Sequence, residues 1–150
     1  MIVYSFMFSP QNESPCVACS SIIDGINGMV HHVQQRVNMV AVTRNSVEKI
    51  QGWIEKKGWD NMRFLSSLHN TYNKDYLAEG SEKDQWPNLN VFRKTDAGIF
   101  HFYATELLFA PADEGQNKRH VDIIWPLWNL FDYTPEGRGE NWFPKHEYKN

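Results

Sequence analysis

The residues most suited to chemistry are the only two cysteines of the chain, Cys16 and Cys19. They follow an apolar run at residues 1–8 and precede a stretch, residues 22–33, in which isoleucine and valine recur at helical spacing. The pair is therefore expected at a strand-to-helix junction. At a helix start, unpaired N–H groups and the positive end of the macrodipole favour a thiolate, and cysteine pKa values there fall to roughly 3.5–7.5.

This placement predicts a redox-active dithiol. Cys16, at the first turn, would be the exposed nucleophile, because Pro15 directly before it is typical of a helix N-terminus near the surface. Cys19, one turn further on the same helix face, would attack a mixed disulfide on Cys16 and release the product.

Two other interpretations of the cysteines stay open. They could be buried structural residues that behave as small hydrophobes. They could also bind zinc, since the spacing from Cys19 to His32 matches a two-Cys two-His finger. A fourth zinc ligand would have to come from three residues that cannot serve, namely Arg36, Val37 and Asn38. We therefore predict neither a metal nor a cofactor, and no nucleotide-binding fingerprint is present in the sequence.

The composition predicts a single globular domain, residues 1–150, because 41% of the residues are hydrophobic and 14% aromatic. The net charge is −3, without a basic stripe, which disfavours nucleic acid and anionic membranes as partners. No apolar run approaches the roughly 20 residues of a membrane helix, and residues 1–8 are too short for a signal-peptide core. We expect a cytoplasmic protein, in which a cysteine pair is more often catalytic than structural.

Apolar runs and turn signals predict five strands, at residues 1–8, 37–43, 63–67, 88–93 and 99–104. Helical patterns cover residues 16–35, 45–58 and 119–131, and a long loop at residues 69–85 holds one short helix near residues 72–77. The turn Asp96-Ala97-Gly98 predicts a hairpin between the last two strands. This order indicates an α/β fold, with a mixed four- to five-stranded sheet, helices on both faces and the dithiol at the carboxyl edge, where ligands bind.

Several details of these elements can also be predicted. Asn45 is the expected N-cap of the second long helix, with Glu48 at its third position, and Gly58 its end. Gly25 and Gly28 are expected to let the first helix approach the sheet. The C-terminal aromatic residues are expected to pack over the sheet rather than to form a homodimer interface, which stays an alternative. They are Trp125, Trp128, Phe131, Tyr133, Trp142 and Phe143.

The chain resembles the thioredoxin-like superfamily over most of its length. The local matches are the strand at residues 1–8 leading into Pro15-Cys16-Val17-Ala18-Cys19, the strand at residues 39–43, and Pro87 before Leu89-Asn90-Val91-Phe92. More narrowly, Val40-Ala41-Val42-Thr43-Arg44 and Asp132-Tyr133-Thr134-Pro135 are similar to an uncharacterised bacterial family, domain of unknown function 899. The resemblance implies a thiol–disulfide oxidoreductase that acts on a protein or small-molecule disulfide. Pro15, Trp86 and Pro87 would line the substrate groove, and the Trp86–Pro87 bond would be cis.

The sequence also departs from these patterns. The first strand has no acidic residue, so the buried carboxylate of thioredoxins is missing. The peroxiredoxin pattern would need a hydroxyl at Glu13 and a proline at Ser9. A peroxiredoxin-like thiol peroxidase is therefore a less favoured alternative, beside a non-catalytic module that binds partners through its aromatic C-terminus. Of the histidines, His69 and His120 lie near loops that could approach the dithiol, whereas His101 is expected to be a satisfied sheet residue.

Overall fold

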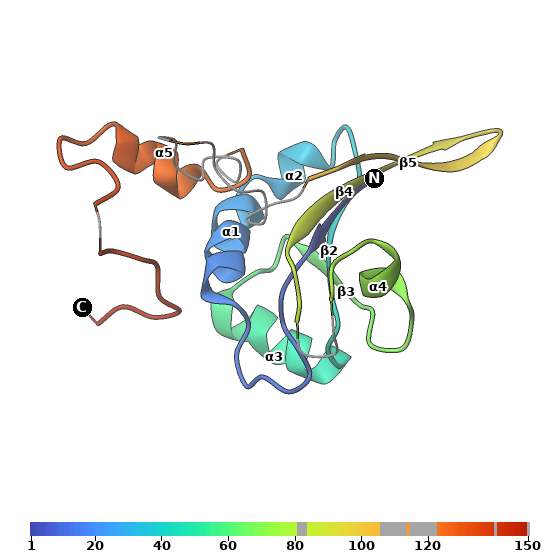
Figure 1. Ribbon diagram of the computed structural model, residues 1–150, viewed down its shortest axis with the longest axis horizontal. Helices are drawn as coiled ribbons and strands as arrows, with labels where there is room; N and C mark the ends of the chain where they lie inside the picture. The colour runs from blue at the N-terminus through green and yellow to red at the C-terminus, as the bar shows by residue number, and fades with distance from the viewer. Residues whose placement is uncertain (81–83, 106–113, 115–122, 140, 150) are drawn as a thin grey trace.

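The computed structural model has a mixed five-stranded sheet at its centre, in the order β3-β2-β1-β4-β5 (Figure 1). It describes residues 1–80, 84–105, 114, 123–139 and 141–149. β2 pairs in parallel with β1 and β3, whereas β4 runs antiparallel to both β1 and β5. The strands are β1 (Ile2–Ser5), β2 (Met39–Thr43), β3 (Arg63–Ser66), β4 (Asn88–Thr95) and β5 (Gly98–Ala104). The prediction of an α/β fold with a mixed sheet and a β4–β5 hairpin is confirmed.

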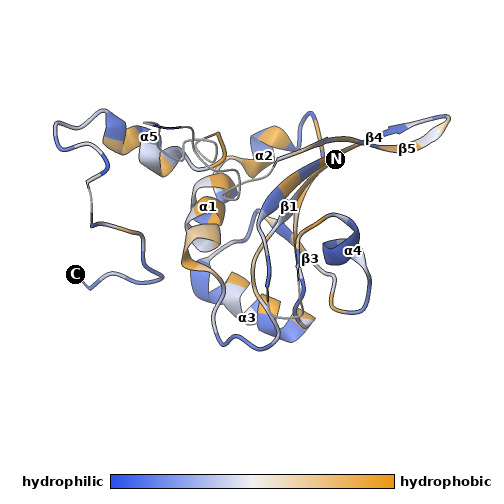
Figure 2. Cartoon of the chain, in the orientation of Figure 1, coloured by the Kyte–Doolittle hydropathy of each residue, from blue (hydrophilic) through white to orange (hydrophobic). Residues whose placement is uncertain are grey.

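Helices lie on both faces of this sheet (Figure 1). They are α1 (Val17–Asn27), α2 (Val30–Val33), α3 (Val47–Lys57), α4 (Tyr72–Asp75) and α5 (Pro126–Asp132). α1 and α3 follow parallel strands and cover one face, because successive right-handed crossovers in one direction put their helices on the same side. α4 lies over the opposite face and is hydrophilic throughout in Figure 2.

The main core lies between the sheet and α1 and α3. Its buried side chains include Tyr4 and Phe6 from the first strand and its extension, and Ile22, Ile23 and Ile26 from α1. β2 is buried over its whole length, as expected for a parallel strand covered on both sides. The core therefore fixes the end of β1 against the start of α1, where both cysteines lie.

The predicted helix at residues 16–35 is instead two helices. α1 ends at Asn27, and the next helix begins only at Val30. The role expected for Gly25 was also wrong: a Cβ at that position would lie 3.6 Å from Cγ of Pro126, and a Cβ on Gly28 would meet nothing within 4 Å. Gly25 therefore lies against the first turn of α5, not against the sheet.

The cap of α3 differs by one residue from the prediction. Ser46 is the N-cap, with its Oγ accepting a hydrogen bond from Lys49 N at 3.3 Å, so Glu48 is at the second helical position. Asn45 is fully buried instead, and its Nδ2 donates to the carbonyl of Ser9 at 3.1 Å. The Asn45 amide, which local capping rules predict at the helix N-terminus, makes a long-range hydrogen bond to Ser9 instead.

The C-terminal aromatic residues pack beside α1 rather than over the sheet. Trp125 is buried in the core and donates from Nε1 to Ser21 Oγ at 3.0 Å. α5 begins at Pro126, inside the helical range predicted at residues 119–131; residues 119–122 of that range lie outside the described part of the chain. Edge-on contacts link Trp128 with Trp125 and Trp142. Tyr133 lies apart from this cluster, 88% exposed.

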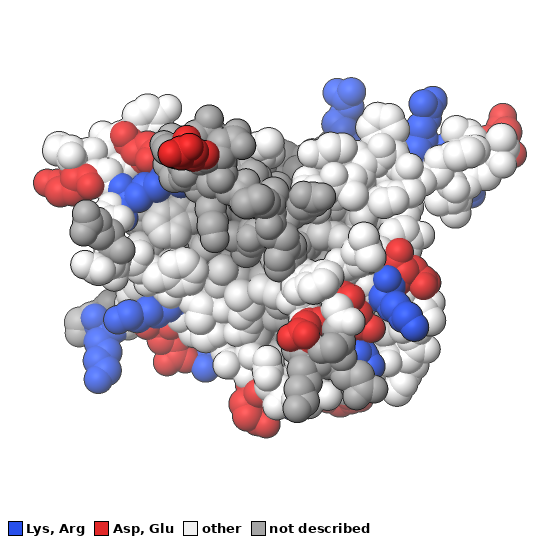
Figure 3. All heavy atoms as spheres, in the orientation of Figure 1, with Lys and Arg blue, Asp and Glu red and all other residues white. Residues whose placement is uncertain are grey.

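In the described part of the chain, no helix has the length and apolar character needed to cross a membrane. On the face shown in Figure 3, acidic and basic side chains are interspersed and the basic ones form no continuous stripe.

The end of α3 allows a direct test of the fold. Gly58 is left-handed, with φ +65, whereas Gly28 has φ −68 and open space around a Cβ. Gly58→Ala should lower the free energy of unfolding by about 1 kcal/mol, because a Cβ is strained in this conformation. The control, Gly28→Ala, should leave stability unchanged or slightly higher. Urea unfolding measures both, and equal losses in the two variants would contradict this account of the helix end.

Candidate functional site

The dithiol is positioned by the segment that leaves β1. Phe6 continues the strand direction with its N–H on the carbonyl of Val42, at 2.8 Å, and Cys16 N donates back to Met7 O at 2.9 Å. The loop between Phe6 and Cys16 is held by side chains from β2 and α3. Thr43 Oγ1 donates to Phe8 O, and Lys49 Nζ donates to Pro10 O. A loop tied at both ends and in the middle presents Cys16 in one place at the start of α1.

Cys16 is the N-cap residue of α1. Its carbonyl accepts from both the backbone N–H and the Oγ of Ser20, at 2.9 and 3.0 Å, so the first helical turn is closed around it. Cys16 is partly exposed, and Cys19, one turn later, is completely buried. The structure therefore confirms that the two cysteines share one helix end with only the first accessible.

The two thiols have opposite acidities. The pKa of Cys16 is lowered to about 6, first by the hydrogen bond from Cys19, against the effect of its own burial, and then by the N–H groups of Cys19 and Ala18. The Cys16 side chain makes no capping hydrogen bond of regular geometry with these N–H groups. They act on the charged thiolate through the helix dipole. Burial, and then Cys16, raise the pKa of Cys19 well above its usual range. At neutral pH the pair is a thiolate next to a thiol.

Tyr4 is a third member of the site. It lies on β1 with its side chain fully buried, and its hydroxyl makes no hydrogen bond of regular geometry with any described residue. It is close enough to interact with Cys19: burial and the two cysteines raise the pKa of Tyr4 well above its usual range, and Tyr4 in turn lowers that of Cys19. The strand that lacks a carboxylate thus places a phenol next to the buried thiol. Its position on the same strand face as Ile2 and Phe6 was the signal that could have revealed it.

The C-terminal segment also reaches the site. His146 Nε2 lies 3.0 Å from the carbonyl of Pro15, and its ring packs against Trp53 with centroids 4.9 Å apart. Because a carbonyl only accepts, Nε2 is the donor in this contact. Nothing in the sequence links residue 146 to residue 15. The sequence pointed instead to His69, which follows the edge strand β3, and to His120, which lies outside the described residues.

Pro15 and Cys16 line a small cavity of about 250 Å³, together with Ser9, Asn12 and Gln85. Pro15, predicted to line the substrate groove, is thus part of the lining of a cavity that also contains Cys16. Gln85, the last residue of the loop predicted at residues 69–85, was not identified from the sequence.

The prediction of a cis Trp86–Pro87 bond is wrong, because no described peptide bond is cis. The backbone of Trp86 is instead tied to the preceding loop, with its N–H on the carbonyl of Ala78 at 2.9 Å. Its ring lies over Gly80, where a Cβ would come within 2.7 Å of it. Pro87 is fully buried at the start of β4. These local contacts, rather than the dithiol, set the path of the chain into the strand.

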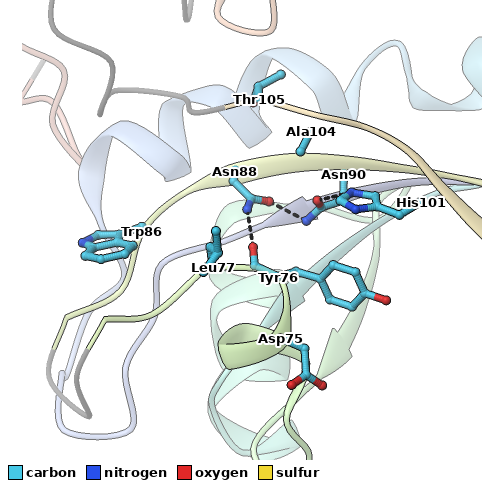
Figure 4. Close-up of a pocket in the computed structure, with 9 residues that line it drawn as sticks. All are labelled: Asp75, Tyr76, Leu77, Trp86, Asn88, Asn90, His101, Ala104 and Thr105. Carbon is cyan, nitrogen blue, oxygen red and sulfur yellow. Dashed lines mark hydrogen bonds between the residues drawn. The ribbon is translucent and has the colours of Figure 1, made fainter.

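Trp86 lines a second, larger cavity of about 580 Å³ on the α4 side of β4 (Figure 4). Asn88 and Asn90 form its polar base, with Asn90 Nδ2 donating to Asn88 Oδ1 and Asn88 Nδ2 donating to Tyr76 O. His101 Nε2 lies 2.8 Å from Asn90 Oδ1, so this histidine is a satisfied sheet residue, as predicted.

The described residues contain no group of three His, Cys, Asp or Glu side chains placed to hold a metal ion. His32, which the zinc alternative required, lies on α2 with its ring 3.9 Å from that of His31.

The acidity of Cys16 can be measured directly. Because the thiolate is the reactive form, alkylation by iodoacetamide should speed up as pH rises and level off above a midpoint of about 6. Cys19→Ala removes the main stabilising hydrogen bond and should move this midpoint up by about one pH unit. Mass spectrometry of quenched samples gives the rate, with Cys16→Ser as the control that removes the fast phase. A wild-type midpoint near the ordinary cysteine value would refute the electrostatics of the site.

Comparisons with known proteins place the chain in a family. A solved structure similar to it is that of a reduced 2-Cys peroxiredoxin from Plasmodium vivax, with 16% identity over 88% of this chain and 80% of that chain, and a TM-score of 0.49. A likeness at that level carries no argument about the reaction. A search of curated proteins gives no match. Residues 1–149 match the family described as "Bacterial protein of unknown function (DUF899)", and the chain therefore belongs to this family.

Proposed function

We propose that this protein is a thiol–disulfide oxidoreductase with Cys16 as nucleophile and Cys19 as resolving thiol. The observation that carries the proposal is the unequal pair at the start of α1: a partly exposed thiolate with a pKa of about 6 next to a fully buried thiol. Structural cysteines have no need of such an arrangement, whereas exchange requires an accessible thiolate and a protected second thiol.

In the first step the Cys16 thiolate attacks one sulfur of a substrate disulfide. The S–S bond breaks, one substrate thiolate leaves and takes a proton from water, and Cys16 is left in a mixed disulfide. In the second step Cys19 loses its proton and attacks Cys16 Sγ, which releases the other substrate thiolate. The substrate gains two electrons, and the Cys16–Cys19 disulfide forms. The reverse sequence oxidises a substrate dithiol.

Deprotonation of Cys19 is the difficult part of the second step, because burial raises its pKa. Conversion of Cys16 to a disulfide removes the charge that opposes this deprotonation. The hydroxyl of Tyr4 and the backbone N–H of Met7 then both favour the thiolate form of Cys19, Tyr4 with the larger effect. Tyr4 is therefore proposed to position and stabilise the attacking sulfur.

The thiol peroxidase alternative is less well supported by the geometry. Its pattern needs a hydroxyl where Glu13 stands. The side chain of Glu13 is 96% exposed, and its carboxylate is 3.9 Å from Lys49 Nζ. An exposed carboxylate cannot donate a hydrogen bond to a peroxide over Cys16. Peroxide consumption by the reduced protein, followed by stopped flow, should accordingly be no faster than that by free cysteine.

A redox titration tests the proposal. Cys16 and Cys19 should form a reversible disulfide with a midpoint between about −120 and −300 mV, the range of known dithiol enzymes. Alkylation and mass spectrometry after equilibration in dithiothreitol or glutathione buffers give the oxidised fraction. Cys19→Ala should instead stop at a trapped mixed disulfide on Cys16. If no reversible disulfide forms in this range, the proposed function is wrong.

Tyr4→Phe tests the second step. Loss of the hydroxyl should slow release of the mixed disulfide about fivefold, the equivalent of ~1 kcal/mol, while Cys16 alkylation stays unchanged. Single-turnover quenching resolves the two steps. Tyr72→Phe is the matched control, because that hydroxyl contacts Ser5 and Asn90 away from the dithiol. Equal effects of the two variants would exclude Tyr4 from the reaction.

A further inference from the structure

Buried polar side-chain atoms without a hydrogen-bond partner gather around the dithiol. In the described part of the chain they are Tyr4 Oη, His146 Nδ1, and both Nε2 and Oε1 of Gln85. A buried polar group left unpaired costs about 1–3 kcal/mol, so each such group calls for an explanation. Tyr4 lies next to Cys19, and the other nitrogen of His146 is bonded to Pro15 O. In Gln85, both polar atoms of the side chain are unpaired.

The backbone of Gln85 is held rather than free. Its residue forms an antiparallel bridge with Glu79, and the Glu79 carboxylate in turn pairs with Arg44 at 3.1 Å. The next residue, Trp86, is tied by its N–H to Ala78 O. The amide is thus carried on a segment fixed to β2 and lines the cavity of about 250 Å³ that also exposes Cys16.

The chemistry of this cavity defines what it can bind. Among the described residues that line it, only Cys16 carries a charge, as its thiolate; the others are Met7, Ser9, Asn12, Ser14, Pro15 and Gln85. A neutral lining next to a thiolate does not favour a carboxylate or a phosphate. An unpaired primary amide is complementary to the backbone of one extended residue, whose N–H and C=O lie on the same side of the chain, since Oε1 can accept from that N–H while Nε2–H donates to that carbonyl.

We infer that this cavity binds the backbone of an extended residue at the substrate disulfide, with Gln85 accepting from the N–H and donating to the C=O of that one residue. The inference rests on the proposed function and adds the class of substrate, a disulfide within a peptide or protein. A cavity of this size is smaller than the roughly 300–1,000 Å³ of a site for a whole drug-sized ligand, as expected when only the segment next to the disulfide is enclosed.

The test compares two disulfides that differ in the amide. One is the disulfide of N-acetylcysteine methylamide, which has a peptide bond on each side of the cysteine; the other is 2-hydroxyethyl disulfide, which has none. Gln85→Leu replaces the amide by an apolar branched side chain and removes both hydrogen bonds. It should lower the rate constant for the amide substrate about tenfold and that for 2-hydroxyethyl disulfide less than twofold. Gln51→Leu is the control, because Gln51 is exposed on α3 and contacts only Glu55 among the described hydrogen bonds.

Urea unfolding separates recognition from a structural role. Gln85→Leu should be at least as stable as the wild type, since it removes two buried atoms that have no partner. A clear loss of stability, or equal rate losses with both disulfides, would overturn the inference, as would unchanged rates with both. If the wild type reduces neither disulfide, the proposed function itself fails; if it reduces both and Gln85→Leu does not discriminate, only the inference fails.

Discussion

The hydrogen bond from the Cys19 thiol to the Cys16 thiolate is the interaction on which the chemistry of this protein depends. It exists because Cys16 is the N-cap and Cys19 is one turn along α1, so the two sulfurs share a helix face. Burial keeps the proton on Cys19, and the helix start favours the charge on Cys16. One helical turn thus separates an accessible nucleophile from a protected thiol.

That turn stays in place because the loop before it is anchored from outside. Thr43 and Asn45, at the end of β2 and before α3, hydrogen-bond the carbonyls of Phe8 and Ser9. The parallel pairing of β1 with β2 brings these residues to the same edge of the sheet. The hydrogen bond from the buried Asn45 amide to a loop carbonyl stabilises a loop that could otherwise sample many conformations. The fold therefore supplies rigidity at the point where the sequence alone gives only a connection rich in polar groups.

The cavity lined by Trp86 and the cavity lined by Gln85 differ in character. The larger one has a polar base in which Asn88, Asn90 and His101 satisfy each other. The smaller one, at the dithiol, is lined by the Gln85 amide, whose two polar atoms have no hydrogen-bond partner among the described residues. A self-paired network is a stable structural element, whereas unpaired buried groups are unstable until a ligand completes them. This contrast is why the smaller cavity, not the larger, is assigned to the substrate.

The sequence by itself determined the features that depend on neighbours in the chain. The apolar run, the following cysteines and the isoleucine period placed the dithiol at a strand-to-helix junction, and Gly58 and Asp96-Ala97-Gly98 marked a helix end and a hairpin, because these signals are local φ/ψ and periodicity constraints. Contacts between distant segments were decided only by the tertiary structure. Asn45 hydrogen-bonds Ser9 O instead of capping α3, and the Trp86 ring packs on Gly80 with a trans bond to Pro87. His146 and Gln85 lie next to the residues of the dithiol. For each of these side chains, the neighbouring sequence allows several hydrogen-bond or packing partners. The partner observed depends on which distant segments the sheet brings together.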